Sequence, residues 1–83
     1  MTNLELTQKW VEKARQVLKG RKIVAVNYAT EEDIAENYFS KRGLMILLDD
    51  GTLISPMTDD ECNDFGAVYF QTKDGKSDIL PTL

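Results

Sequence analysis

The acidic side chains between positions 49 and 64 have the clearest capacity for chemistry in this chain. They lie in an Asp-Asp pair and in the stretch MTDDECNDFGA: Asp49, Asp50, Asp59, Asp60, Glu61 and Asp64. Carboxylate oxygens at this density are typical ligands of Mg²⁺ or Ca²⁺. An EF-hand is excluded, because such a loop needs glycine directly after its third ligand, where Asp64 stands. We assign no metal ligand, and contact of these six residues with a small ligand, a cation or a protein partner is a hypothesis.

The same acids also fit a purely structural interpretation. Thr58 followed by Glu61 is a capping-box pattern, in which the two side chains satisfy backbone N–H groups at a helix start. Asp59 and Asp60 would lie in the first turn, where the helix dipole stabilises negative charge. We therefore expect a short capped helical turn here, and Asp64 is the one acid that this interpretation leaves without a structural role.

Several classes of enzyme are excluded by composition. The chain has no histidine and a single cysteine, Cys62. The Ser-His and Cys-His nucleophile systems, most zinc sites and any intramolecular disulfide are therefore ruled out. Ser55 and Ser77 have no imidazole to activate them. We predict a non-enzymatic protein with no catalytic residue and no cofactor.

Charge is distributed unevenly along the chain. Residues 1–22 carry six Lys or Arg against two Glu, which is +4, and residues 31–64 carry ten acids against two bases, which is −8. The remaining residues balance, so the sum is the net charge of −4. An acidic pI near 4.6 argues against direct nucleic-acid binding. The acidic segment suggests one further alternative, a protein that mimics nucleic acid.

The chain has no apolar run near the roughly 20 residues that span a bilayer. Its first ten residues, MTNLELTQKW, are too polar for a signal peptide. We therefore expect a cytoplasmic protein with no membrane partner.

Apolar spacing and capping residues predict two helices and a first strand. Leu6, Trp10 and Val17 recur at helical spacing and predict an amphipathic helix over residues 3–19. The run KIVAVNYA (22–29) predicts an internal strand, because it is apolar on both faces. A shorter second helix is expected in TEEDIAENYF (30–39), with Tyr38 on its inner face.

Two Asp-Gly pairs predict two β-hairpins. Each lies between apolar runs, the usual signature of a two-residue type I′ loop. The first hairpin would place Leu47 opposite Ile54, and the second would place Phe70 opposite Ile79. Both faces of the first hairpin are apolar. We therefore expect an element of this chain or of another subunit to cover each face.

Together these elements predict one α+β domain over residues 1–83. In it, the N-terminal helix packs on a curved antiparallel sheet of about five strands, which could close into a small open barrel. A split βαβ arrangement is the competing topology.

The stretch LDDGTLISPMTDDECNDFGAVYF, with the terminal LPTL, resembles a small domain family of bacteria and their phages. Its pattern is a DGT hairpin, an acidic DDE-x-N segment, then Gly-Ala and Leu-Pro, and the resemblance covers roughly residues 20–83. The chain departs from it at Cys62 and Phe65, where small residues are expected. The family has no established activity, so the resemblance implies no catalytic residues. It implies one structural unit made of both hairpins and the acidic segment.

These observations lead to three functional hypotheses. The leading one is a small binding or regulatory protein that acts through protein–protein contacts with an unknown partner and through self-association, as a homodimer for example. The second is a small-ligand or divalent-cation-binding protein that uses the acidic 49–64 region. The third, suggested by the phage resemblance, is an acidic decoy of nucleic acid in the conflict between phage and host.

Overall fold

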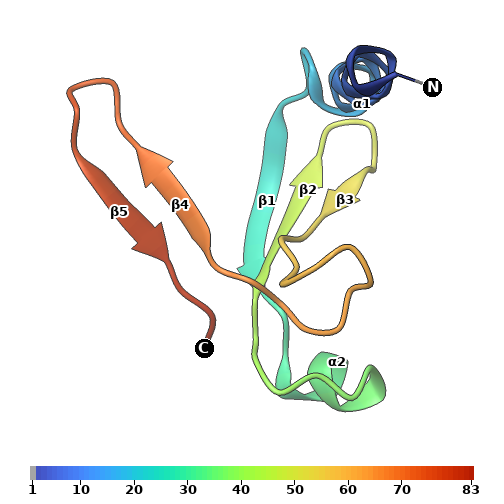
Figure 1. Cartoon of the computed structure of the whole chain (residues 1–83). Helices are drawn as coiled ribbons and strands as arrows, with labels where there is room; N and C mark the ends of the chain where they lie inside the picture. The colour runs from blue at the N-terminus through green and yellow to red at the C-terminus, as the bar shows by residue number, and fades with distance from the viewer. Residues whose placement is uncertain (1) are drawn as a thin grey trace.

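The computed structural model describes residues 2–83, which form two helices and five strands (Figure 1). In chain order these are α1 (Asn3–Leu18), β1 (Ile23–Tyr28), α2 (Glu31–Glu36), β2 (Leu44–Leu48), β3 (Leu53–Ile54), β4 (Val68–Gln71) and β5 (Ser77–Leu80). The α+β class is confirmed. No helix within these residues combines the length and apolar character that crossing a membrane requires.

The five strands form two separate antiparallel sheets. One has the order β1-β2-β3, and the other is the β4–β5 hairpin, which we call the arm. The arm stands away from the first sheet, so the molecule has the shape of an open V (Figure 1). The five strands are thus present as predicted, but they do not close into a barrel, since no ladder joins the arm to the first sheet. A split βαβ unit needs two parallel strands joined by a helix, with another strand between them. Here β1 and β2, which are joined through α2, are antiparallel neighbours, so that topology is excluded.

α1 forms where expected but covers no face of the sheet. Its N-terminus is capped by Thr2, whose hydroxyl oxygen accepts a hydrogen bond from the Glu5 N–H at 3.1 Å. The helix lies beyond the β2–β3 turn rather than over the strands (Figure 1), and none of its residues is buried. Trp10 on the apolar stripe is 54% exposed. The predicted packing of this helix on the sheet is therefore corrected: its apolar stripe has no covering element in the described chain.

The core is small and lies where β1 and β2 meet the segment before the arm. Its buried hydrophobic residues are Ala29, Leu44, Leu48 and Phe65. The Phe65 ring packs edge-on against Phe39, with 5.2 Å between ring centroids. An isolated bridge joins Phe65 to Met57 and closes the acidic loop between them. The buried Phe65 side chain lies against Gly43, directly before β2, and so anchors the loop there.

The first Asp-Gly hairpin forms with a longer loop than predicted. The Leu48 N–H donates to the Thr52 carbonyl at 2.8 Å, and the Gly51 N–H donates to the Leu48 carbonyl at 3.1 Å. Gly51 has φ +88°, whereas Asp50 is not among the residues with positive φ. A type I′ loop would force Asp50 into the left-handed region as well, at a steric cost that the three-residue loop avoids.

The extra loop residue shifts both hairpins by one position. In the first, Ile54 lies opposite Ile46 instead of Leu47. In the second, Phe70 lies opposite Asp78 instead of Ile79, with Gly75 at φ +88° in the loop. A shift of one residue exchanges the faces of one strand relative to its partner, so Ile54 shares a face with Ile46 instead of Leu47.

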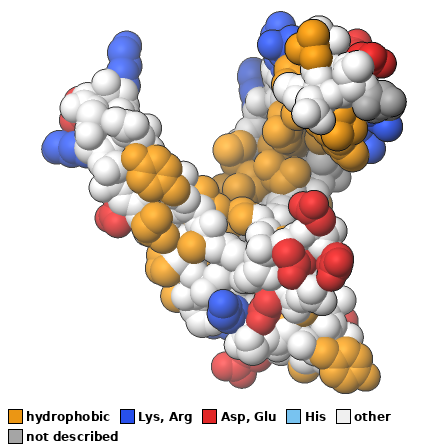
Figure 2. All heavy atoms as spheres, in the orientation of Figure 1, with side chains coloured by type: hydrophobic (Ala, Val, Ile, Leu, Met, Phe, Trp, Pro, Cys, Tyr) orange, Lys and Arg blue, Asp and Glu red, His pale blue; other side chains and the backbone are white. Residues whose placement is uncertain are grey.

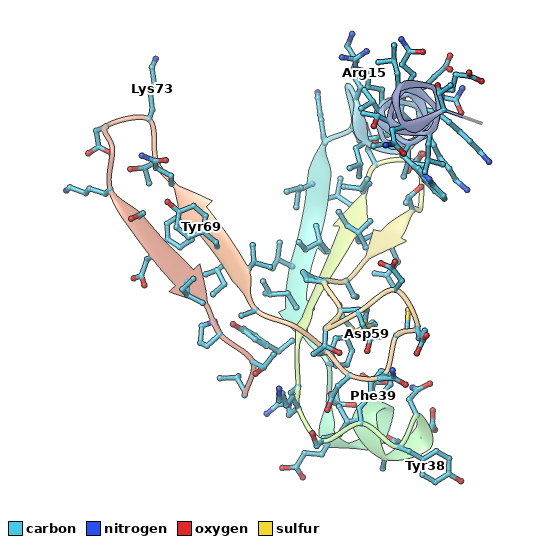
Figure 3. All side chains as sticks on the ribbon, viewed as in Figure 1. Arg15, Tyr38, Phe39, Asp59, Tyr69 and Lys73 are labelled. Carbon is cyan, nitrogen blue, oxygen red and sulfur yellow. The ribbon has the colours of Figure 1, made fainter. Side chains whose placement is uncertain are left out.

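α2 is shorter than predicted and ends before Tyr38. Thr30 and Asp33 form a reciprocal capping box, with N–H to oxygen distances of 2.9 and 3.1 Å. Tyr38 then has φ +59° and is 96% exposed, so it does not belong to an inner face. Its ring projects outward at the end of the molecule beside α2 (Figure 3).

Candidate protein-interaction surface

Asp49 and Asp50 lie in the turn between β2 and β3, beside the residues that follow α1. Their carboxylates face the Arg21 guanidinium at 3.7 and 3.6 Å. Asp50 also accepts a hydrogen bond from the Thr52 N–H at 3.1 Å, and this bond lowers the pKa of its carboxyl below the usual value. These two acids therefore stabilise the turn and its contact with the start of β1.

Asp59 organises the acidic loop, and the predicted capped helical turn is wrong. Its carboxylate accepts from the Glu61 N–H at 3.0 Å and from both the N–H and the side-chain amide of Asn63, at 3.2 and 2.8 Å. The Asn63 side chain is the main cause of a lowered pKa at Asp59. Thr58 instead donates its N–H to the Asp64 carbonyl at 3.0 Å. Asp59 outcompetes Thr58 for the cap because it can satisfy several donors at once.

Asp64, which had no predicted structural role, has the most hydrogen bonds of the six acids. Its carboxylate accepts from the Ser40 N–H at 3.1 Å, the Ser40 hydroxyl, the Lys41 N–H at 3.2 Å and the Phe65 N–H at 2.8 Å. The Ser40 hydroxyl is the largest cause of a pKa lowered from 3.8 to about 2. Asp64 thus joins the acidic loop to the bend before β2.

Asp49, Asp50, Asp59 and Asp64 belong to these separate networks, and Glu61 accepts a hydrogen bond from the Asn63 side-chain amide at 3.3 Å. Within residues 2–83, no group of three or more Asp, Glu or Cys side chains is placed to hold a metal ion. Asp59 lies in the loop between β3 and the arm (Figure 3), and Asp60 lines a surface hollow with Trp10 of α1. The structure therefore does not bring the proposed ligand residues together into one site.

A large exposed apolar surface is the more prominent feature of the molecule. It gathers between α1 and the strands beneath it and along the arm (Figure 2). We call the following residues the apolar surface: Leu6, Trp10 and Val17 on α1, Ile23, Val24 and Val26 on β1, and Tyr69, Ile79 and Leu80 on the arm. Each is at least 38% exposed. Large exposed apolar areas on a protein often mark sites of interaction with another protein.

The exposed area of the whole molecule also exceeds that of a compact monomer. The chain exposes 6688 Å², whereas a compact monomer of its 9.4 kDa exposes about 5,000 Å². Its radius of gyration is 14.9 Å, against about 12 Å for a compact chain of this length. The excess, about 1,700 Å², is surface that an ordinary monomer would have buried.

β1 lies at an edge of its sheet, contrary to the prediction of an internal strand. The Ala29 N–H donates to the Gly43 carbonyl at 2.8 Å. Backbone groups alternate in direction along an antiparallel strand, so Asn27 also turns its N–H and C=O toward β2. Val26 and Tyr28 turn theirs toward the free edge. The prediction of an apolar strand is confirmed, but within residues 2–83 β1 pairs with β2 alone.

No protein-family model, curated protein or solved structure matches this chain. The resemblance of residues 20–83 to a domain family of bacteria and phages therefore stays a prediction.

Proposed function

We propose that this protein is a non-enzymatic binding or regulatory module that acts through protein–protein contacts and associates with itself. The observation that supports this most directly is the apolar surface of α1, β1 and the arm, which no element of the described chain covers. The acidic side chains of 49–64 then serve mainly to fix turns.

The elements that carry this surface are unstable on their own. An isolated helix of α1's 16 residues is marginal in water, because helix nucleation is costly and little packing offsets it. A lone two-stranded hairpin such as the arm is likewise marginal. Both elements are ordered here without intramolecular partners, which supports a function in which a second molecule packs against them.

The size of the surface fits a permanent partner. If each chain of a symmetric pair covers its excess of about 1,700 Å², the interface buries about 3,400 Å² in total. Obligate homodimers bury roughly 2,000 to 5,000 Å², whereas transient complexes bury less. A homodimer in which each chain is completed by the other therefore accounts for the area.

Sedimentation equilibrium tests the self-association. Since one chain has a mass of 9.4 kDa, a dimer has 2 × 9.4 = 18.8 kDa, and we expect that mass at micromolar concentration. A mass of 9.4 kDa that persists at millimolar concentration would contradict the proposal.

A further inference from the structure

We propose that two copies of this chain join through the free edges of their β1 strands, paired antiparallel about a two-fold axis. The result is a continuous six-stranded sheet, β3-β2-β1 of one copy followed by β1-β2-β3 of the other. This inference rests on the proposed self-association and names the strand that forms the contact.

From Val26 to Tyr28, the β1 edge has none of the features that usually prevent strand pairing. Edge strands are protected by proline, by charged side chains or by bulges. Residues 23–28 (IVAVNY) contain no proline and no charge, and the register irregularity is confined to the start of the strand, between Ile23 and Ala25. Val26 on this edge is 53% exposed. The strand is therefore open to a second strand along most of its length.

The backbone directions fix the register. Val26 and Tyr28 point their N–H and C=O groups outward, so these are the groups that a second β1 must meet. An antiparallel partner satisfies both residues when Val26 of one copy lies opposite Tyr28 of the other. Asn27 then lies on the two-fold axis, opposite Asn27 of the partner subunit. This places the one polar side chain of β1 beside its own copy, where two amides can hydrogen-bond.

Charge favours this direction of pairing. β1 starts beside basic residues, Lys19 and Lys22, and ends before the first turn of α2, which carries Glu31, Glu32 and Asp33. Antiparallel pairing brings the basic end of each copy next to the acidic end of the other. Parallel pairing would put like charges together. Such complementarity at an interface rim supports orientation and encounter more than affinity.

A designed disulfide tests the register. In a Cys62→Ser background, Asn27→Cys puts a thiol at the axis, where Cα atoms of a non-hydrogen-bonded pair are about 4.5 Å apart, within disulfide range. We expect quantitative covalent dimer under mild oxidation. The matched control is Tyr38→Cys in the same background, because Tyr38 is exposed but distant from β1, and we expect little covalent dimer from it.

A proline substitution tests the edge itself. The Val26 N–H is not used within its own copy, so Val26→Pro removes only an intermolecular donor. We expect it to keep the far-UV circular dichroism of the wild type and to raise the dimer dissociation constant by at least about tenfold. Ala25→Pro is the control, since the Ala25 N–H faces β2 and its loss damages the fold itself. Should Val26→Pro fail to fold, Val26→Lys places a charge on the same edge and is expected to weaken the dimer in the same way.

The outcomes separate this inference from the proposed function. A dimer that survives Val26→Pro or Val26→Lys, and in which Asn27→Cys forms no disulfide, overturns β1 pairing while self-association stands. If the arm of the partner, and not its β1 strand, paired with β1, Asn27→Cys would form no disulfide. A wild-type monomer at high concentration overturns both proposals.

Discussion

Asp64 connects two parts of the chain that are distant in sequence. It accepts hydrogen bonds from Ser40, 24 residues earlier, and from the Phe65 N–H next to it. Phe65 is one of the few buried side chains. The carboxylate therefore holds the acidic loop in the position that places this ring in the core.

The lowered pKa of Asp64 predicts a specific acid sensitivity. Its pKa is about 2 in the folded chain against an ordinary 3.8, so the carboxylate stabilises the fold above pH 3.8 and loses that effect as pH falls toward 2. We expect Asp64→Asn to be less stable than the wild type at neutral pH and to lose less stability between about pH 4 and pH 2. Urea titrations across this range measure both effects.

The control for that prediction is Asp60→Asn. The Asp60 carboxylate is exposed and makes no hydrogen bond with residues 2–83. We expect this variant to keep the acid sensitivity of the wild type. Equal slopes for Asp64→Asn and the wild type would contradict the structural role assigned to Asp64.

Local sequence patterns predict contacts between residues a few positions apart. They do not predict contacts between residues that are distant in sequence. Helix caps such as Thr2 and Thr30 are local features, because a cap and its N–H donor are three residues apart. The role of Asp64 depends on Ser40, which no local pattern connects to it. The capped turn at Thr58 failed because Asp59, one residue later, accepts from the Glu61 N–H that the Thr58 cap would have used.

At the scale of elements, both hairpins depend on a glycine in the left-handed region. Gly51 has φ +88°, and nothing lies within 4 Å of the position that a Cβ would take. The cost of Gly51→Ala is therefore a backbone cost alone, about 1 to 2 kcal/mol. We expect Gly51→Asn to lose much less, because asparagine tolerates this conformation. Urea unfolding at one fixed protein concentration compares them, and equal losses would contradict the left-handed conformation of Gly51.

The sequence predicted most helices and strands, but it did not predict their register or which elements lie beside one another. Periodicity identified α1, and apolar runs with Asp-Gly pairs identified the strands. The one-residue shift of each hairpin escaped prediction, because two-residue and three-residue loops share the same Asp-Gly signal. β1 was expected inside a sheet since it is apolar on both sides, yet this chain supplies a neighbour on one side only.

At the scale of the whole molecule, the chain is more open than a compact monomer of its mass. It exposes 6688 Å², and the arm, α1 and the outer edge of β1 have no partner strand or helix within residues 2–83. The proposed pairing with a second copy would give the outer edge of β1 a partner strand. It also assigns a role to the opposite charges at the two ends of β1.

Amide hydrogen exchange at β1 tests this account most directly. Asn27 directs its N–H to β2 within its own copy, whereas Val26 and Tyr28 direct theirs to the free edge. Residue-resolved exchange at a concentration where sedimentation gives the dimer mass should show Val26 and Tyr28 protected to about the same degree as Asn27. Fast exchange at Val26 and Tyr28 beside a protected Asn27, in a protein of dimer mass, would contradict the pairing of β1 with its copy.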